Sequence, residues 1–202
     1  MLYLADILAT GYEVGVLNGR VQPGDTVAVV GAGPIGLATI VGARLFSPAA
    51  IVAVDPAESR RDWASAFGAT AVATPEEARG VVAGLTDGLG ADVAVEAVGI
   101  PETFEQCTEL IWPGGRVANV GVHGKAATLH LESLWIRDVT IATGLVDTFS
   151  TPTLLRAVAT GQLAPTRFTT HRFPLEAAMD AYDTFARAGE TNALKVLMTT
   201  QG

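Results

Sequence analysis

The sequence predicts an α/β protein built on a doubly wound, six-stranded parallel sheet. Short runs of consecutive apolar residues, rich in valine and alanine, alternate with longer segments whose apolar residues recur at helical spacing. Hydrophobic residues make up 49% of the chain but aromatic residues only 6%, which is typical of parallel strands covered by helices on both faces. The strands fall into two groups of three, and this arrangement favours the spatial order 3-2-1-4-5-6.

The first half of the chain begins with a helix and then alternates strands with helices. A Gln-Pro-Gly-Asp turn at 22–25 delivers the chain into the first strand. The predicted elements are a helix over 6–17, a strand over 27–30, a helix over 35–46, a strand over 51–54, a helix from 55 to 67 and a short strand over 71–73.

The second half continues the alternation and then adds a tail. Up to residue 150 we expect a helix over 75–85, a strand over 92–96, a helix that Pro101 opens and that ends near 112–115, and strands over 116–120 and 139–143. The tail contains a helix, a strand over 170–173, a helix over 175–188 and a strand over 194–199. Because these elements extend past a complete sheet, we expect 1–150 and 151–202 to form different structural units.

The loop between the first strand and the following helix carries a G-x-G-x-x-G pattern. In this position the first glycine permits a tight turn, the second lets the main chain approach a pyrophosphate, and the third lets the helix pack closely on the strand. Amides at the start of the helix would face the phosphates. The candidates for binding a dinucleotide are therefore Gly31, Gly33, Pro34, Ile35 and Gly36.

Asp55 ends the second strand, about 20 residues beyond the glycines, where a carboxylate accepts hydrogen bonds from the adenosine ribose. A phosphate on that ribose would be repelled by about 4 kcal/mol at 4 Å and an effective dielectric near 20, so the pattern favours NAD over NADP. Arg60 and Arg61 lie nearby, and either could neutralise a phosphate or remain a solvated helix charge. Asp55 could also be the N-cap of a helix with Pro56 at its first position.

Two further glycine turns follow the fourth and fifth strands. In a doubly wound sheet the ligand lies beyond the carboxyl ends of the strands. We therefore expect Val98-Gly99 and Val120-Gly121 to border the same crevice as Gly31 and Asp55. The alternative interpretation is that these glycines serve only to turn the chain from strand to helix.

Composition excludes several classes of partner. The formal net charge is −8 with lysine only at 125 and 195, so we expect no nucleic acid partner. No apolar run is long enough to span a membrane and the N-terminus lacks signal-peptide features, so we expect a cytoplasmic protein without a membrane partner. Cys107 is the only cysteine, which excludes disulfides within the chain, and we expect it to be an inert core residue.

Beyond these patterns, the chain resembles the zinc-dependent medium-chain alcohol dehydrogenases over nearly all of its length. The stretches that carry the resemblance are Asp6-Ile-Leu-Ala-Thr-Gly-Tyr-Glu13, Val21-Gln-Pro-Gly-Asp25, the GAGPIG turn at 31–36, Glu96-Ala-Val-Gly99, Gly114-Gly-Arg-Val117 and Ala193-Leu-Lys-Val196. The resemblance implies the nucleotide-binding half of such an enzyme, a Rossmann fold whose C-terminal segment returns toward a catalytic domain that would lie before Met1.

The resemblance also implies roles for individual residues. Asp6 falls where the family places its third catalytic zinc ligand, although it could instead be a helix N-cap. The other zinc ligands would lie before Met1, and His123, His130 and His171 have no spacing that replaces them. The cofactor contacts implied are Thr10 beside the nicotinamide, Arg60 near the adenosine ribose, Lys195 near the pyrophosphate, and the backbone at Ile141 and Thr143 against the carboxamide.

The function implied by the resemblance is oxidation of an alcohol to an aldehyde or ketone by hydride transfer to NAD, with zinc in the complete enzyme. The chain alone is expected to bind NADH without oxidising alcohols. Two alternatives remain: a non-catalytic NAD(H)-binding module, and a zinc-free medium-chain reductase acting on enones or quinones. The family often pairs through the edge strand near 139–143, so we expect a homodimer or homotetramer.

Overall fold

A computed structural model describes residues 2–200 of the chain. Its main feature is a six-stranded, wholly parallel sheet in the order β3-β2-β1-β4-β5-β6. The strands are β1 (Thr26–Val30), β2 (Ala50–Val54), β3 (Ala71–Ala73), β4 (Ala91–Glu96), β5 (Ile111–Asn119) and β6 (Thr140–Thr143). The predicted doubly wound sheet and its strand order are confirmed.

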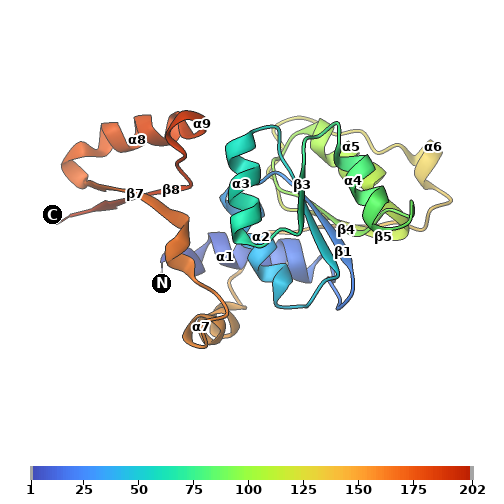
Figure 1. The fold of residues 1–202 in the computed structure, drawn as a ribbon, viewed down its shortest axis with the longest axis horizontal. Coiled ribbons are helices and arrows are strands. Elements are labelled where there is room, and N and C mark those ends of the chain that lie inside the picture. The colour runs from blue at the N-terminus through green and yellow to red at the C-terminus, as the bar shows by residue number, and fades with distance from the viewer. Residues whose placement is uncertain (1, 201–202) are drawn as a thin grey trace.

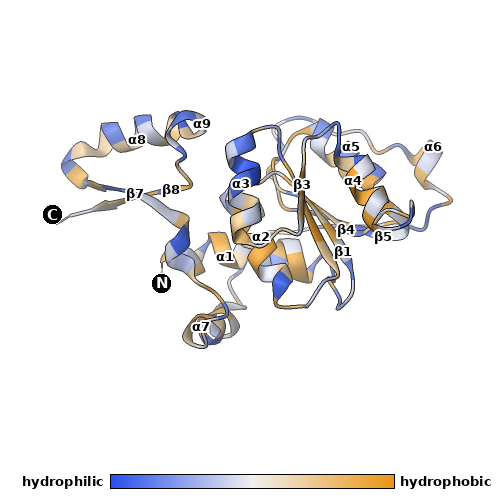
Figure 2. Cartoon of the chain, viewed as in Figure 1, coloured by the Kyte–Doolittle hydropathy of each residue, from blue (hydrophilic) through white to orange (hydrophobic). Residues whose placement is uncertain are grey.

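Helices cover both faces of this sheet (Figure 1). One face packs against α1 (Ile7–Thr10), a π-helical segment (Gly11–Leu17), α2 (Pro34–Arg44) and α3 (Glu58–Phe67), and the other against α4 (Ala78–Leu85) and α5 (Pro101–Leu110). Each face has its own apolar core, because side chains alternate along β1: Val27 and Val29 enter one core, Ala28 and Val30 the other. Figure 2 shows the resulting apolar centre of the sheet.

The tail forms a small sheet of its own beside the large one (Figure 1). After α7 (Thr151–Ala159), β7 (Thr169–Pro174) and β8 (Lys195–Thr199) form a parallel pair, and α8 (Ala178–Ala186) and α9 (Ala188–Thr191) connect them. Phe168 ties this small sheet to the large domain, since its ring packs edge-on against Phe67 with centroids 4.9 Å apart. The predicted division after residue 150 falls at the start of α7.

Three local expectations were wrong in detail. The helix after β2 begins at Glu58, not at Pro56, because Asp55 bonds the Ala57 amide in a turn before the helix. The predicted helix over 6–17 changes from α to π geometry at Gly11. The third difference is the short helix α6 (Leu131–Leu134), where the sequence predicted no element.

Within residues 2–200, no helix combines the length and the apolar character needed to cross a membrane.

Candidate functional site

The glycine turn after β1 has the conformation that its pattern predicted. Gly31 has φ = 97°, and a Cβ there would lie 2.6 Å from the Val98 side chain, so only glycine fits without strain. A Cβ at Gly36 would lie 1.8 Å from the Gly31 carbonyl oxygen, which shows how closely α2 approaches the turn. At Gly33, by contrast, a Cβ would meet nothing within 4 Å. Gly33 therefore faces open space into which a ligand could come.

The start of α2 offers free main-chain donors at this open space. Gly33 is the N-cap residue, Pro34 takes a first-turn position, and no described side chain caps the helix. The first amides of an α-helix have no partner within the helix. The amides of Ile35 and Gly36, together with the positive end of the helix dipole, can therefore receive an anion such as a pyrophosphate.

Asp55 lies over the glycine turn. Its carboxylate accepts hydrogen bonds from the Ala32 amide and the Ala57 amide, both at 2.9 Å. Each carboxylate oxygen keeps further acceptor capacity, which ribose hydroxyls could use. Arg61 donates to the carbonyl oxygens of Asp55 and Pro56, at 2.7 and 2.8 Å. Its guanidinium therefore stabilises the turn between β2 and α3. Arg60 Nη1 is buried and has no hydrogen-bond partner within residues 2–200.

A hollow of about 570 Å³ opens at the carboxyl ends of β1 and β2, lined also by the turn after β4 and by α5, next to the switch point between β1 and β4 where the strand order reverses. Ligands of doubly wound folds bind at this switch point. Of the predicted cofactor contacts, the hollow brings Gly31, Asp55 and Val98 together; its lining does not include Gly33, Pro34, Ile35, Gly36, Gly99, Val120 or Gly121. Among the described residues, its charged lining consists of carboxylates without a lysine or arginine: Asp55, Glu102, Glu105 and Glu109.

The other two glycine turns meet beside this hollow. A Cβ at Gly121 would lie 2.3 Å from the Gly99 amide nitrogen, so the two turns are in direct contact. Both turns are tied to Glu96, the last residue of β4: its carboxylate binds the Val98 and Gly99 amides, and its carbonyl oxygen accepts from Val120 and Gly121. Glu96 was not among the predicted site residues. The available signal was a charged residue that ends an otherwise apolar strand at the switch point.

The remaining candidates lie at more scattered positions. Asp6 is exposed at the N-cap position of α1, but its side chain accepts from the Thr10 hydroxyl at 3.2 Å and does not cap the helix. Ile141 and Thr143 lie on the edge strand β6, paired with Val117 and Asn119. Lys195 lies outside the hollow, at the start of β8, with Nζ 5.8 Å from the Phe185 ring centroid.

The histidines have different surroundings. His123 is only partly exposed, lies in the loop after β5 and is 3.4 Å from Glu96. His130 is on the surface, where a hydrogen bond to Glu132 raises its pKa. Within residues 2–200 no three histidine, cysteine or carboxylate side chains cluster closely enough to hold a metal ion. The described residues therefore do not form a zinc site, and Asp6 could supply at most one ligand.

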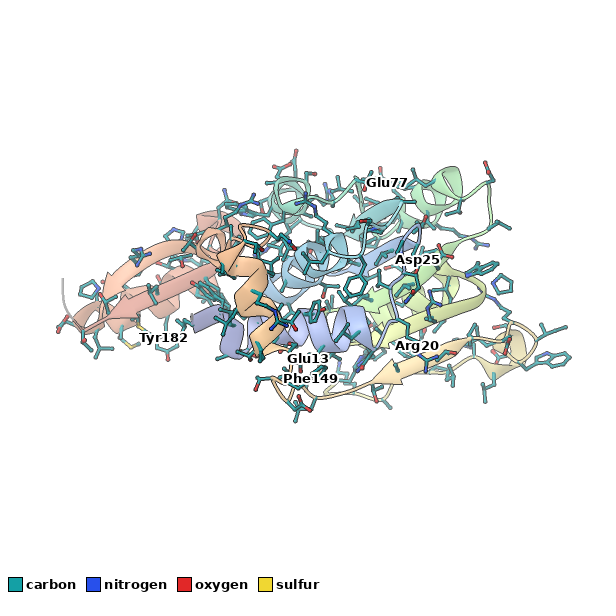
Figure 3. The ribbon with its side chains drawn as sticks, turned by 90° about the horizontal axis from the view of Figure 1, so that it is seen from below. Glu13, Arg20, Asp25, Glu77, Phe149 and Tyr182 are labelled. Atoms are coloured by element: carbon teal, nitrogen blue, oxygen red, sulfur yellow. The ribbon has the colours of Figure 1, made fainter. Side chains whose placement is uncertain are left out.

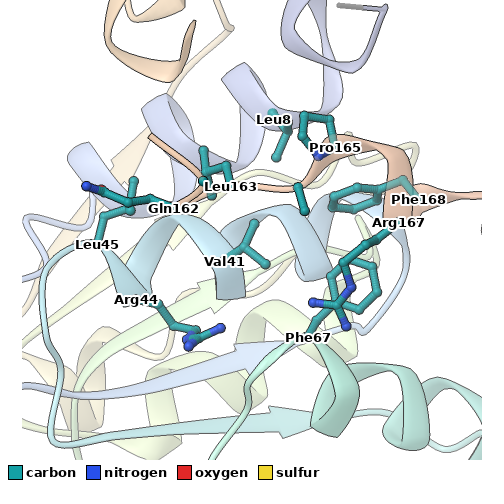
Figure 4. A pocket seen from close by; sticks show the side chains of 12 residues that line it. Leu8, Val41, Arg44, Leu45, Phe67, Gln162, Leu163, Pro165, Arg167 and Phe168 are labelled. Atoms are coloured by element: carbon teal, nitrogen blue, oxygen red, sulfur yellow. The ribbon is translucent and has the colours of Figure 1, made fainter. Parts of the chain in front are cut away.

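A second hollow, of about 530 Å³, lies away from the glycine turns (Figure 4). It is bounded by α1, α2, the end of α3 and the segment 161–168, with Arg44 and Arg167 at its rim. It lacks Gly31 and the carboxylate of Asp55, which line the first hollow, so the first is the better candidate for a dinucleotide.

Comparison with known proteins identifies the family. Residues 34–159 match the family described as zinc-binding dehydrogenase. The chain belongs to the zinc-binding dehydrogenases. An alcohol dehydrogenase of Cupriavidus necator is 34% identical over 192 residues, which are 92% of this chain and 52% of that protein. The resemblance to zinc-dependent alcohol dehydrogenases is thus confirmed.

Two further members of the family are informative. The structure of zinc dependent alcohol dehydrogenase 2 from Streptococcus pneumonia superposes with a TM-score of 0.92 at 44% identity, over 97% of this chain and 58% of that one. An NADP-dependent isopropanol dehydrogenase of Thermoanaerobacter brockii is 32% identical over 65% of this chain and 38% of its own length. The chain spans about half the length of the curated alcohol dehydrogenases from Cupriavidus necator that it matches.

Proposed function

We propose that this chain is the cofactor-binding half of an NAD-dependent alcohol dehydrogenase. The observation that carries the proposal is the carboxylate of Asp55, which lines the hollow with Gly31 and accepts from the Ala32 amide, next to the open turn at Gly33 and the uncapped start of α2. In this proposal the amides of Ile35 and Gly36 hold the pyrophosphate, and Asp55 accepts the hydroxyls of the adenosine ribose.

The nicotinamide of NAD accepts a hydride from the alcohol carbon. The contribution of this chain is to hold and orient that ring. We assign Thr10 and the backbone at Ile141 and Thr143 to the nicotinamide side, Arg60 to the adenosine side and Lys195 to the pyrophosphate. The buried, unpartnered Nη1 of Arg60 supports its assignment, because a buried donor without an acceptor is costly unless a ligand supplies one. The turns at Val98-Gly99 and Val120-Gly121 border the same site.

The charge of the hollow supports NAD over NADP. Its described lining holds four carboxylates and no cation, so the additional phosphate of NADP would meet like charge from several sides. An NADP-dependent relative exists, which makes the preference worth measuring.

The substrate would be a small alcohol or carbonyl compound, as for the alcohol dehydrogenases that the chain matches. Because the described residues form no metal cluster, we expect chain 1–202 by itself to bind NADH without oxidising alcohols. The same observation favours the second candidate function, a non-catalytic NAD(H)-binding module.

We also propose that copies of the chain associate through the edge strand β6. One side of β6 has no neighbouring strand within residues 2–200, and Trp135 and Ile136 next to it are 73% and 70% exposed. A homodimer or homotetramer would cover this apolar surface.

Isothermal titration calorimetry of the purified chain with NADH tests the proposed function. We expect saturable binding with one site per chain, and no alcohol-dependent reduction of NAD even with added zinc. Lack of any binding of NAD or NADH would overturn the proposal. Zinc-dependent turnover of simple alcohols would instead show that the chain is a complete enzyme.

A further inference from the structure

Glu96 is the charged residue buried deepest in the large sheet. It ends β4 between Val30 of β1 and Asn119 of β5, and its exposed fraction is 0%. A buried carboxylate costs free energy unless hydrogen bonds and an opposite charge compensate it. The contacts around Glu96 show what provides that compensation.

One carboxylate oxygen and the carbonyl oxygen of Glu96 hold the two glycine turns. Oε1 accepts from the Val98 amide at 2.9 Å, the Gly99 amide at 2.8 Å and the Thr103 hydroxyl at 2.6 Å. The carbonyl oxygen accepts from the amides of the second turn, Val120 and Gly121, at 2.8 and 3.1 Å. A single residue therefore fixes both turns relative to each other.

The second carboxylate oxygen faces a histidine. Oε2 has no hydrogen-bond partner within residues 2–200, and His123 Nε2 lies 3.4 Å from it. The same His123 nitrogen also forms a hydrogen bond with Asn119 Oδ1, at 2.9 Å. Gly121 leaves room for this approach, because a Cβ there would lie 2.3 Å from Oε2.

Two further side chains lie beside the Glu96 carboxylate. Burial, and then the Glu96 charge, raise the pKa of the Cys107 thiol, on α5, well above its ordinary value, so this thiol stays neutral. His123 Nδ1 is buried without a partner among the described residues, so the polar contacts of this ring to Glu96 and Asn119 are made by Nε2. The hydrogen bonds that the first glycine turn and Thr103 donate to Oε1 thus compensate the buried carboxylate.

We propose that Glu96 is a positioning residue for the bound dinucleotide. Glu96 fixes the two glycine turns in the position in which they border the cofactor, and His123 holds the Glu96 carboxylate in place. The role rests on the proposed NAD site. It goes beyond that site by naming a buried side chain, outside the lining of the hollow, that fixes the turns bordering it.

Two variants remove the pair without removing bulk: Glu96→Gln and His123→Gln. The surface pair of His130 and Glu132, whose side chains approach to 2.7 Å, provides matched controls in His130→Gln and Glu132→Gln. The first measurement is amide hydrogen exchange of the ligand-free proteins. We expect the amides of 98–99, which donate to the carboxylate, to exchange at least tenfold faster in Glu96→Gln and at the wild-type rate in both controls. The amides of 120–121 donate to the main-chain carbonyl of Glu96, which the variant keeps, so they serve as an internal reference.

The second measurement is the dissociation constant of NADH at pH 7, with the free energy of unfolding of each protein measured beside it. We expect binding at least tenfold weaker in Glu96→Gln, a smaller loss in His123→Gln and wild-type affinity in both controls. Glu96→Asp keeps a carboxylate and should recover part of the affinity that Glu96→Gln loses. If Glu96→Gln does not fold, the same measurements on Glu96→Asp and His123→Gln decide the proposal. If the wild type binds NADH and the variants bind it equally well, the role of Glu96 is overturned but the NAD site is not. If the wild type does not bind NADH, both the NAD site and the role of Glu96 are overturned.

Discussion

Glu13 and Ser150, 137 residues apart in the chain, are joined by two hydrogen bonds: Glu13 Oε1 accepts from the Ser150 amide at 2.9 Å and from its hydroxyl at 2.5 Å. The other carboxylate oxygen accepts from the amides of Asp147 and Thr148, each at 3.2 Å. Figure 3 shows Glu13 beside the segment that contains Phe149. One buried carboxylate on the π-helical segment thus holds the loop between β6 and α7.

The first prediction concerns the stability that this contact provides. Glu13→Gln removes the charge that all four donors share, and we expect the free energy of unfolding to fall by about 2 to 4 kcal/mol, since hydrogen bonds to charged groups contribute more than neutral ones. Urea unfolding measures the change. Glu176→Gln, at an exposed position, is the control and should leave stability unchanged. An equal effect of the two substitutions would contradict the anchoring role of Glu13.

The second prediction is the pH dependence of this stabilisation. Burial raises the pKa of Glu13, but the hydrogen bonds from Ser150, Asp147 and Thr148 together outweigh it, so the pKa lies below the ordinary value of 4.5. The contribution of a lowered carboxyl pKa is complete above the unfolded value and is lost as pH falls through the folded one. The stability difference between wild type and Glu13→Gln should therefore be constant from about pH 5.5 to 7 and shrink below 4.5. A difference that grows on acidification would argue against it.

The third prediction separates cofactor binding from folding at the glycine turn. Gly33 has φ = −72° and open space around its Cα, so Gly33→Val should leave stability within about 0.5 kcal/mol of wild type. The valine side chain would occupy the space assigned to the pyrophosphate, and we expect NADH affinity to fall at least tenfold, or about 1.4 kcal/mol. Gly80→Ala, on α4 and also in open space, should not change affinity. Unaltered NADH binding by Gly33→Val would place the cofactor elsewhere.

The fourth prediction concerns the choice between NAD and NADP. Asp55→Ala removes the carboxylate closest to the expected position of the ribose, and we expect the ratio of NADPH to NADH dissociation constants to fall about tenfold, which is roughly 1.4 kcal/mol. Fluorescence titration with both cofactors measures the ratio. Asp62→Ala, an exposed carboxylate on α3, serves as the control. If both dissociation constants stay as in wild type, Asp55 does not contact the ribose.

Much of the sheet could be predicted because its signals are local. Continuous apolar runs give parallel strands, and the glycines at 31, 33 and 36 mark a strand-to-helix turn whose first residue has a backbone conformation that favours glycine. The same signals predicted that Gly31, Asp55 and Val98 share one hollow at the strand ends.

The contacts of Glu13 and Glu96 could not be predicted in the same way. Glu13 bonds residues more than 130 positions away, and nothing near it in the sequence indicates Ser150. Glu96 looks like an ordinary strand end until the fold brings the turn after β5 against the turn after β4. Long-range polar contacts depend on tertiary packing, which local periodicity does not encode.

The glycines of the π-helical segment have a mechanical consequence. An ideal Cβ at Gly11 would lie 2.6 Å from the Thr39 amide nitrogen, and one at Gly15 would lie 2.7 Å from the Thr39 hydroxyl. At these positions the backbone of the segment lies directly against α2, without side chains between them. We therefore expect the two elements to move as one rigid unit. A displacement of the helical turn that carries Asp6 and Thr10 would therefore also move α2, whose first residues are Pro34 and Ile35.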